Sequence, residues 1–173
     1  MKSELRIFAY GTLKKGFRNH DRYCAGVLRV CPAWLRGRLF KLSAEIPVMT
    51  IPEEDILLRG TASPAIDIQA RKRFEPASGG KGAEGPASSD GAAWRTVRGE
   101  LLVFGDAEKR LPLLDSLEGF CPGGRSEYIR VLVHVNLAGG TQTSAWTYIA
   151  GFDPAGLEDY TGESWAHLPF FRA

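Results

Sequence analysis

The sequence predicts an α+β protein whose mixed or mostly antiparallel sheet curls into a small β-barrel. Three observations support this fold class. About six segments have the alternation or the β-branched and aromatic composition of strands, only one or two have a helical pattern, and strands and helices do not alternate regularly. A doubly wound nucleotide-binding fold needs that regular alternation. We therefore expect a mixed barrel of about six strands with one or two flanking helices.

The composition of the 173 residues is that of one ordinary globular domain. Hydrophobic residues make up 44% of the chain, charged residues make up 24%, and the formal net charge is +2. A chain of this length can bury a hydrophobic core. Its near-neutral charge argues against general disorder and against a basic surface that binds nucleic acid. We expect a single domain over residues 1–173.

The cysteines and the apolar segments indicate a reducing, cytoplasmic environment. Cys24, Cys31 and Cys121 are odd in number and lack CxxC spacing, which argues against a zinc site and against a disulfide framework. No apolar run approaches the roughly 18 to 20 residues that span a bilayer. Charged residues interrupt the N-terminal segment where a signal peptide needs an apolar core. We therefore expect a cytoplasmic protein with no membrane partner.

The N-terminal region is expected to form a strand, a turn and a short helix. Residues 4–10 (ELRIFAY) alternate with a period of two, and their two aromatic residues suggest a central strand that is covered on both faces. A glycine-rich turn over residues 11–16 follows. A short helical turn then begins at Asn19 or Asp21, since both are good N-cap residues.

The middle of the chain is expected to hold two strands and an insertion. Strands are expected at residues 34–42 and 46–51, and Pro47 marks a strand edge or a bulge because proline cannot donate to a strand ladder. From about residue 52 to 96 we expect a flexible Gly/Pro/Ser-rich insertion in a surface loop. Residues 75–93 contain no aliphatic residue larger than alanine.

Regular patterning resumes with a strand at residues 97–104 and a helix within residues 105–119. Asp106 is a candidate N-cap of this helix, and Gly119 is a natural residue for its C-terminal end. Pro112 is unusual inside a helix. It either kinks the helix or is the first residue of a shorter one.

The last regular elements form a predicted β-hairpin. Residues 127–137 and 141–152 are rich in strand-forming residues, and Gly139 and Gly140 between them are typical of a hairpin turn. The tail from Asp153 onward has no clear period, and we expect its aromatic residues to pack onto the body of the protein. These aromatic residues are Tyr160, Trp165, Phe170 and Phe171.

The turn YGTLKKG, residues 10–16, has two interpretations. As a plain turn, Gly11 supplies an unusual backbone angle and Thr12 bonds the local backbone. As a site, successive backbone N–H groups at a strand end hold a carboxylate or an oxyanion, while Gly11 permits close approach and Tyr10 forms a wall. The turn by itself does not choose between the two.

Two acidic residues near the end of the predicted helix are candidates for proton transfer. Asp115 and Glu118 are three residues apart and lie on the same helical face. A partly buried carboxylate at the negative end of a helix has a raised pKa and suits a general base, although both acids fit a solvated helix face as well. Strand alternation places Tyr128 and Arg130 on one face, from which Arg130 could pair with Asp115 or Glu118.

Taken together, these motifs resemble a known family. FAYGTLKKG, RGRLFKL followed by IPVM, RGELLVF, and LLDSLEGF followed by EYIR have the order and spacing of the γ-glutamylcyclotransferase-like superfamily. The chain is most similar to γ-glutamylamine cyclotransferases and their AIG2-like relatives. The resemblance extends from residue 6 to about residue 149, apart from the insertion.

The resemblance implies a fold and an activity. The fold is a small β-barrel with flanking helices. The activity is a cofactor-independent cyclotransfer, of the lyase or acyltransferase class, which converts a γ-glutamyl amine or γ-glutamyl amino acid into 5-oxoproline and a free amine. By motif position the substrate-binding residues are Tyr10, Gly11, Thr12, Leu13 and, at the pocket rim, Tyr128, and the general acid/base is Glu118. No metal is required.

Other functions stay open at this point. A module of the same fold could bind a carboxylated metabolite without turning it over, and an ion pair between Glu118 and Arg130 would favour that alternative. Nucleic-acid binding is disfavoured by the near-neutral charge, and we expect Lys14 and Lys15 to face solvent. The FCPGGRS segment and the insertion depart from the family pattern, so the leaving amine is not identified. Monomer and homodimer are equally compatible with the sequence.

Overall fold

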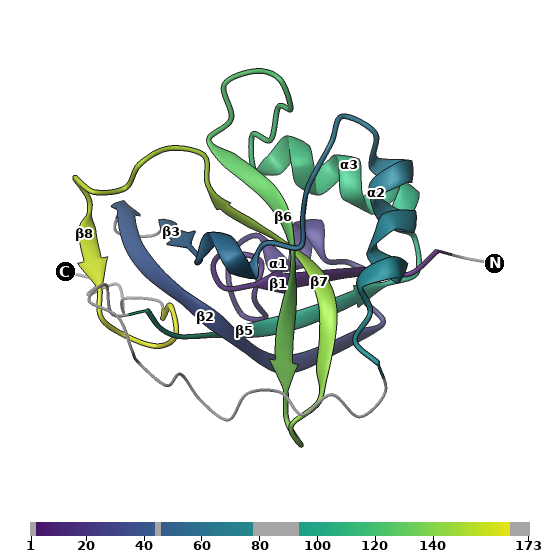
Figure 1. Ribbon diagram of the computed structural model, residues 1–173, viewed down its shortest axis with the longest axis horizontal. Helices are drawn as coiled ribbons and strands as arrows, with labels where there is room; N and C mark the ends of the chain where they lie inside the picture. Colours follow the sequence, from purple (N-terminus) through teal and green to yellow (C-terminus); the bar gives the residue numbers. More distant parts are fainter. Residues whose placement is uncertain (1–2, 44–45, 78–93, 167–173) are drawn as a thin grey trace.

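The computed structural model describes residues 3–43, 46–77 and 94–166. Within them the strands are β1 (Leu5–Ala9), β2 (Arg29–Ser43), β3 (Ile46–Thr50), β4 (Leu58–Arg59), β5 (Arg95–Phe104), β6 (Tyr128–Leu137), β7 (Gln142–Ala150) and β8 (Glu158–Tyr160). The helices are α1 (His20–Tyr23), α2 (Pro64–Ala70) and α3 (Ala107–Leu117), with short 3-10 turns η1 (Glu53–Asp55) and η2 (Arg71–Phe74). Figure 1 shows their arrangement.

The centre of the molecule is a closed five-strand barrel. Its strands follow the order β2-β5-β1-β7-β6, and pairing of β6 with β2 closes the ring. Only the β1–β7 neighbours in this ring are parallel. Outside the ring, β3 and β8 pair with β2, and β4 pairs with β6. These pairings confirm the predicted α+β class and the small mixed barrel.

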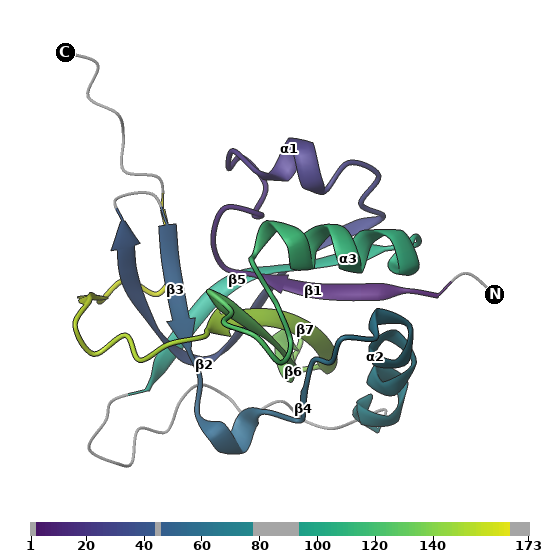
Figure 2. The ribbon, with the colours of Figure 1, turned by 90° about the horizontal axis from the view of Figure 1, so that it is seen from above.

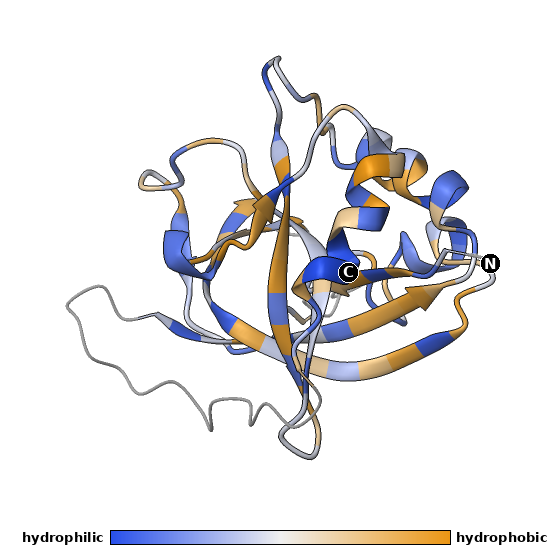
Figure 3. Ribbon diagram, turned by 45° about the vertical axis from the view of Figure 1, so that its right-hand side comes forward, coloured by the Kyte–Doolittle hydropathy of each residue, from blue (hydrophilic) through white to orange (hydrophobic). Residues whose placement is uncertain are grey.

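Strand β1 is covered on both faces, as its sequence predicts. Leu5, Ile7 and Ala9 belong to one buried cluster, which includes residues of α3, whereas Phe8 and Tyr10 belong to a second cluster with residues of β2, β5 and β6. Figure 2 shows α3 lying along β1, and Figure 3 shows hydrophobic residues concentrated on the barrel strands. The two clusters hold the end of β1 in a fixed place, from which the glycine-rich turn departs.

Helix α3 runs through Pro112, so the shorter helix that would begin at this proline is wrong. Asp106 is the N-cap residue, but its side chain makes no capping bond. Its carboxylate instead pairs with Arg110 on the next turn, at 2.9 Å. Leu111 and Leu114 face the barrel and are fully buried, and each contributes roughly 1.5 to 3 kcal/mol through the removal of apolar surface from water.

The C-terminal end of α3 has the geometry of a Schellman motif. Gly119 has φ +61°, which is a left-handed conformation that glycine adopts without strain. The Phe120 N–H donates to the Asp115 carbonyl at 2.9 Å, and the Gly119 N–H donates to the Ser116 carbonyl at 3.4 Å. The prediction that Gly119 follows the helix end is therefore confirmed, and Glu118 is the C-cap residue.

The first half of the predicted insertion is folded, which corrects its boundary of about 52 to 96. Residues 52–77 contain η1, β4, α2 and η2. Ile68 and Asp67 are buried on α2, and Leu58 of β4 pairs with Leu132 of β6. Ile68 belongs to the core cluster on the α3 side, and Leu57, Leu58 and Phe74 pack against it, while the polar contacts of Asp67 and Glu75 add to this attachment. Residues 78–93, the richest part in glycine and serine, lie outside the described residues.

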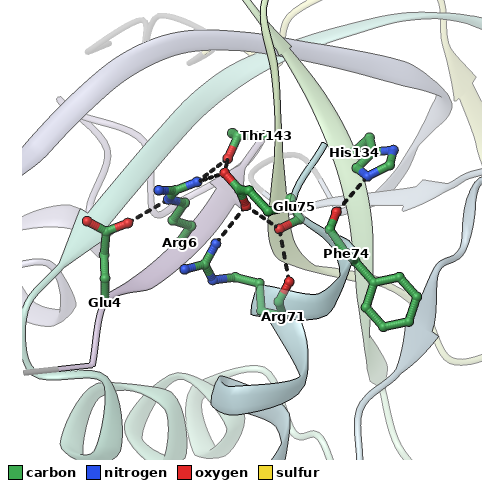
Figure 4. Close-up of polar contacts among 8 residues, drawn as sticks. Glu4, Arg6, Arg71, Phe74, Glu75, His134 and Thr143 are labelled. Atoms are coloured by element: carbon green, nitrogen blue, oxygen red, sulfur yellow. Dashed lines mark hydrogen bonds and ion pairs between the residues drawn. The ribbon is translucent and has the colours of Figure 1, made fainter. Parts of the chain in front are cut away.

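Glu75 fastens the end of this segment to the barrel (Figure 4). Its carboxylate accepts hydrogen bonds from Ser144 Oγ at 2.8 Å, Thr143 Oγ1 at 2.9 Å and Arg71 Nη1 at 3.0 Å, and it pairs with Arg6 of β1. Burial alone would raise the pKa of Glu75, but the donors from Ser144, Thr143 and Arg6 lower it. The carboxylate therefore stays ionised and joins η2 to β1 and β7.

Both predictions for Pro47 are confirmed. Strand β3 lies at the end of the sheet order, and the register between β2 and β3 shifts between Lys41 and Ser43, beside Pro47. An edge strand tolerates a residue without an N–H group because that position has no partner to satisfy. The β6–β7 hairpin also forms as expected, with positive φ at Gly139 and Gly140.

The tail packs onto the barrel through β8 and Trp165. Strand β8 pairs with β2, and the rings of Tyr160 and Trp165 lie 4.9 Å apart between centroids. Packing of these two aromatic residues confirms the expectation, whereas Phe170 and Phe171 lie outside the described residues. Among the residues described here, no helix has the length and apolar character needed to cross a bilayer.

Candidate active site

A cavity of about 170 Å³ opens where β1 ends and α3 terminates. Five parts of the fold meet there: the turn after β1, the C-cap of α3, the start of β6, the middle of β7 and the β2–β3 edge. The residues that line the cavity include Tyr10, Gly11, Thr12, Leu13, Pro47, Glu118, Glu127, Tyr128 and Tyr148. The structure thus brings together the predicted general acid/base and the predicted substrate-binding residues, whereas Asp115, the other acidic candidate, does not line the cavity.

The turn after β1 is closed by its own backbone and by α1. The Lys14 N–H donates to the Gly11 carbonyl at 3.1 Å. Asn19 donates its backbone N–H to the Thr12 carbonyl at 3.2 Å and its side-chain Nδ2 to Thr12 Oγ1 at 2.9 Å. Asn19 is the N-cap of α1, as predicted, but its side chain orders the turn instead of capping the helix.

The carbonyl groups of Gly11, Thr12 and Leu13 accept hydrogen bonds, whereas their N–H groups have no partner among the described residues. The Leu13 carbonyl oxygen lies 2.7 Å from His20 Nδ1 and accepts from Cys24 Sγ at 3.7 Å. No protein acceptor within the described residues bonds the N–H groups of Gly11, Thr12 or Leu13. Three successive amide donors on a pocket wall are suited to a carboxylate or a developing oxyanion.

Gly11 is required by the neighbouring β3 edge. A Cβ atom at this position would lie 2.8 Å from Pro47 Cγ, which is closer than real contacts allow. The absence of a side chain lets the turn and Pro47 approach each other across the pocket. The predicted close approach of a carboxylate or oxyanion to Gly11 stays a prediction.

Glu118 lines the same pocket with a partly buried carboxylate. Within the described residues, no hydrogen bond or ion pair engages this carboxylate. Burial raises the pKa of Glu118 from 4.5 to about 7, because the charged form loses solvation and gains no partner. A carboxyl group with this pKa both accepts and returns a proton near neutral pH.

Arg130 does not pair with Glu118. Its guanidinium forms ion pairs with Asp115 of α3 and with Asp67 of α2. Asp115 also accepts a hydrogen bond from Tyr148 Oη at 2.8 Å. The structure therefore separates the two acids of α3 into a paired one and an unpaired one.

Three buried tyrosines complete the pocket wall. Tyr10 Oη donates to the Tyr148 carbonyl at 2.8 Å, and Tyr128 Oη donates to the Pro47 carbonyl at 3.0 Å. Burial raises the pKa of Tyr10, Tyr128 and Tyr148, so these hydroxyls stay protonated. Tyr128 lies in the wall rather than at the expected rim, since it is only 7% exposed.

Two pocket residues are not found by sequence reasoning. Tyr148 is one of several aromatic residues in the sequence of its strand. Strand alternation predicts which face of the sheet it lies on, but it does not predict the contact with Asp115. Glu127 is the first residue of the EYIR motif, immediately before Tyr128, and it also lines the pocket. Nothing in the sequence distinguishes it from a surface acid.

Lys14 does not face solvent, which corrects the sequence prediction. Its ammonium is buried and donates to the Trp165 carbonyl at 2.6 Å and to Ser164 Oγ at 3.0 Å. Burial lowers the pKa of Lys14. Lys15 is exposed, as expected. The side chain of Lys14 thus attaches the C-terminal region to the back of the turn.

Within the part of the chain that the structure describes, no group of three His, Cys, Asp or Glu side chains is placed to hold a metal ion. Cys24, Cys31 and Cys121 are free thiols.

Comparison with protein-family models matches the chain to a family described as gamma-glutamyl cyclotransferase, AIG2-like, over residues 7–75 and 72–167. Comparison with curated proteins gave no match. The family match extends over well more than half of the chain.

Solved structures share this fold at low sequence identity. YkqA from Bacillus subtilis is 18% identical with a TM-score of 0.54, over 94% of this chain and 39% of that one. An AIG2-like protein from Mus musculus is 22% identical with a TM-score of 0.50, over 94% and 88%. A gamma glutamyl cyclotransferase specific to glutathione from yeast is 14% identical with a TM-score of 0.50, over 86% and 69%.

The chain thus covers less than half of YkqA but most of the mouse protein. At these identities the solved structures show only that the fold is shared. Membership of a family is shown by the match to the family model. With the closed barrel and the YGTL turn in place, the match over residues 7–167 shows that this chain belongs to the gamma-glutamyl cyclotransferase, AIG2-like family.

Proposed function

We propose that the protein is a cofactor-independent cyclotransferase that converts a γ-glutamyl amine or a γ-glutamyl amino acid into 5-oxoproline and a free amine. One observation carries this proposal. Glu118 lines one cavity with Gly11, Thr12 and Leu13, and within the described residues neither its carboxylate nor their N–H groups have a bonding partner. Membership of the family supports the reaction class.

The reaction is an intramolecular attack of the substrate α-amine on its own γ-carbonyl carbon. As the new N–C bond forms, Glu118 accepts a proton from the unprotonated α-amine. The same proton passes to the leaving nitrogen as the γ-amide C–N bond breaks, so the carboxylate is regenerated and no co-reactant is consumed. The N–H groups of the turn stabilise the oxyanion that develops on the γ-carbonyl oxygen. Since both reacting groups belong to one substrate, folding it in the pocket supplies their proximity.

The pKa of Glu118 fits this role. A general acid/base is most effective when its pKa lies near the working pH, and burial raises the pKa of Glu118 to about 7. The hydroxyls of Tyr10 and Tyr128 donate to backbone carbonyls and are held in their protonated form. They support the wall, while Glu118 has no competing partner among the described residues.

The test is release of 5-oxoproline by the purified protein from a panel of γ-glutamyl amines and γ-glutamyl dipeptides, followed by mass spectrometry. Release from at least one member supports the proposal, and failure with the whole panel contradicts it. Binding without turnover would favour the alternative, a carboxylate-binding module. That alternative lacks the ion pair between Glu118 and Arg130 that would have supported it.

A further inference from the structure

Behind the active-site wall, one buried guanidinium joins two helices. Arg130 of β6 is completely buried, and Asp67 of α2 is only 1% exposed. The Nη1 atom of Arg130 pairs with Asp115 of α3, and its Nη2 atom pairs with Asp67 and lies 3.3 Å from the Thr61 carbonyl. Two different nitrogens therefore hold two different carboxylates, which a planar guanidinium can do and a single ammonium cannot.

Arg130 also contacts the chain immediately after Glu118. Its guanidinium carbon lies 4.7 Å from the centroid of the Phe120 ring and 5.2 Å from that of Trp146. The Phe120 N–H donates to the Asp115 carbonyl at 2.9 Å. Arg130 thus holds the last turn of α3 at Asp115 and at Phe120, and Glu118 lies between these two points.

Stability alone is a weak explanation for this cluster. Burying one positive and two negative groups carries a desolvation cost that apolar packing avoids, and Arg130 Nε has no hydrogen-bond partner among the residues that the structure describes. Gly60 has to lack a side chain, because a Cβ atom there would lie 2.8 Å from Arg130 Nε. An apolar residue would fill the site at lower cost but would not fix the direction of α3.

We propose that Arg130 and Asp67 are positioning residues, which hold the C-cap of α3 so that the Glu118 carboxylate faces the amide donors of the turn. Neither residue touches the pocket. Asp67 lies in the segment 52–77, which the sequence predicted to be a loop. In this proposal the segment is part of the framework that supports the site. The expected effect on turnover rests on the proposed function, whereas the expected effect on Glu118 itself does not.

The test compares Arg130→Lys with the wild type. Lysine keeps the charge and most of the stem, but its one nitrogen cannot occupy the two separate positions from which Nη1 and Nη2 bind the carboxylates. Since misplacement of a catalytic group by about 1 Å costs on the order of 10²-fold in rate, we expect kcat to fall at least about tenfold while KM changes less than about threefold. A purely structural role would lower the melting temperature and leave both constants unchanged at a temperature where the variant is folded.

A second readout needs no substrate. The carboxyl carbon of Glu118 is titrated by NMR and assigned by the signal missing from Glu118→Gln. In Arg130→Lys the Glu118 carboxylate is no longer held in place and becomes more hydrated. Its titration midpoint therefore moves from near 7 toward the ordinary value of glutamate. Tyr10, Tyr128 and Tyr148 stay neutral over this range, and the fit includes the neighbouring carboxylate of Glu127.

Arg36→Lys is the matched control. Arg36 also binds two carboxylates, those of Glu54 and Asp55, but on the exposed surface. This variant should leave kcat, KM and the Glu118 midpoint unchanged. If Arg130→Lys does not fold, Asp67→Asn replaces it, because the amide retains hydrogen bonds to Thr61 while it loses the charge that holds Arg130.

The outcomes separate this proposal from the proposed function. A folded variant with wild-type kcat and an unmoved Glu118 midpoint overturns the positioning role. A wild-type protein that releases no 5-oxoproline overturns the proposed function, and the Glu118 midpoint then decides the positioning role alone.

Discussion

Asp115 and Glu118 lie one turn apart on α3, but Arg130 binds only Asp115. Both residues are acids near the end of the same helix, and their difference comes from what surrounds them. Asp115 meets a guanidinium and the hydroxyl of Tyr148. Glu118 meets the cavity. Arg130 thus pairs with one acid of this helix end, and the other acid lines the cavity without an ion pair among the described residues.

Replacement of Glu118 by glutamine should lower kcat at least about 10²-fold, because removal of a general acid/base costs that much. The measurement is 5-oxoproline release under saturating substrate. Glu108→Gln, an exposed acid on the same helix, is the control and should retain the wild-type rate. Equal rates for Glu118→Gln and the wild type would remove Glu118 from the mechanism.

The rate should fall as the pH drops below 7. In the proposed mechanism Glu118 acts as a base in its charged form, and burial raises its pKa to about 7. The carboxylate therefore predominates above this value and is lost by protonation below it, with kcat/KM decreasing about tenfold per pH unit on the acid side. A pH–rate profile of the wild-type enzyme checks this. An acid limb centred near 4.5 would mean that the acting carboxylate is solvated.

Glu118→Gln should be more stable than the wild type at pH 8. A carboxyl group whose pKa rises from 4.5 to about 7 on folding stabilises the fold below the lower value, and this contribution is lost as the pH rises through the higher one. The neutral amide avoids that loss, so the variant should gain about 2 to 3 kcal/mol at pH 8. Urea unfolding at pH 4 and pH 8 measures the difference, which should be present only at pH 8.

Lys14→Met should destabilise the protein by about 1 to 3 kcal/mol, since the Trp165 carbonyl would lose its buried donor. Urea unfolding measures the change in free energy. Lys15→Met is the matched control, because its side chain is exposed and surface substitutions typically change stability by less than about 0.5 kcal/mol. Equal effects of the two variants would contradict the buried placement of Lys14.

Local patterns in the sequence were sufficient for elements whose partners are near in the chain. Strands β6 and β7 are joined by a turn that contains two adjacent glycines. Helix α3 is followed by Gly119, whose left-handed backbone conformation favours glycine. The turn residues 10–13 and Glu118 were predicted as a site from motif order, and the structure places them around one cavity. Their catalytic and binding roles are still predictions.

Contacts between distant parts of the chain were not predictable in the same way. Lysine is usually a surface residue, so the sequence gives no sign that Lys14 is buried. Its partner Trp165 is distant in the sequence and lies beside it only in the folded barrel. Residues 52–77 contain only a two-residue strand and short helices, so no periodic pattern marks them, although Leu57, Leu58 and Ile68 pack in the core. Their attachment also depends on Asp67 and Glu75, which meet partners on β6, β1 and β7.

Arg130 also determines how the molecule unfolds locally. If either α2 or α3 left the barrel alone, the guanidinium would lose Asp67 or Asp115 and remain as a poorly compensated charge among aromatic rings, at a cost of about 3 to 5 kcal/mol. Detachment of one helix is therefore penalised until the other detaches as well. The two helices should exchange their amide hydrogens in a single cooperative opening, although α2 lies within the predicted insertion and α3 follows it in the chain.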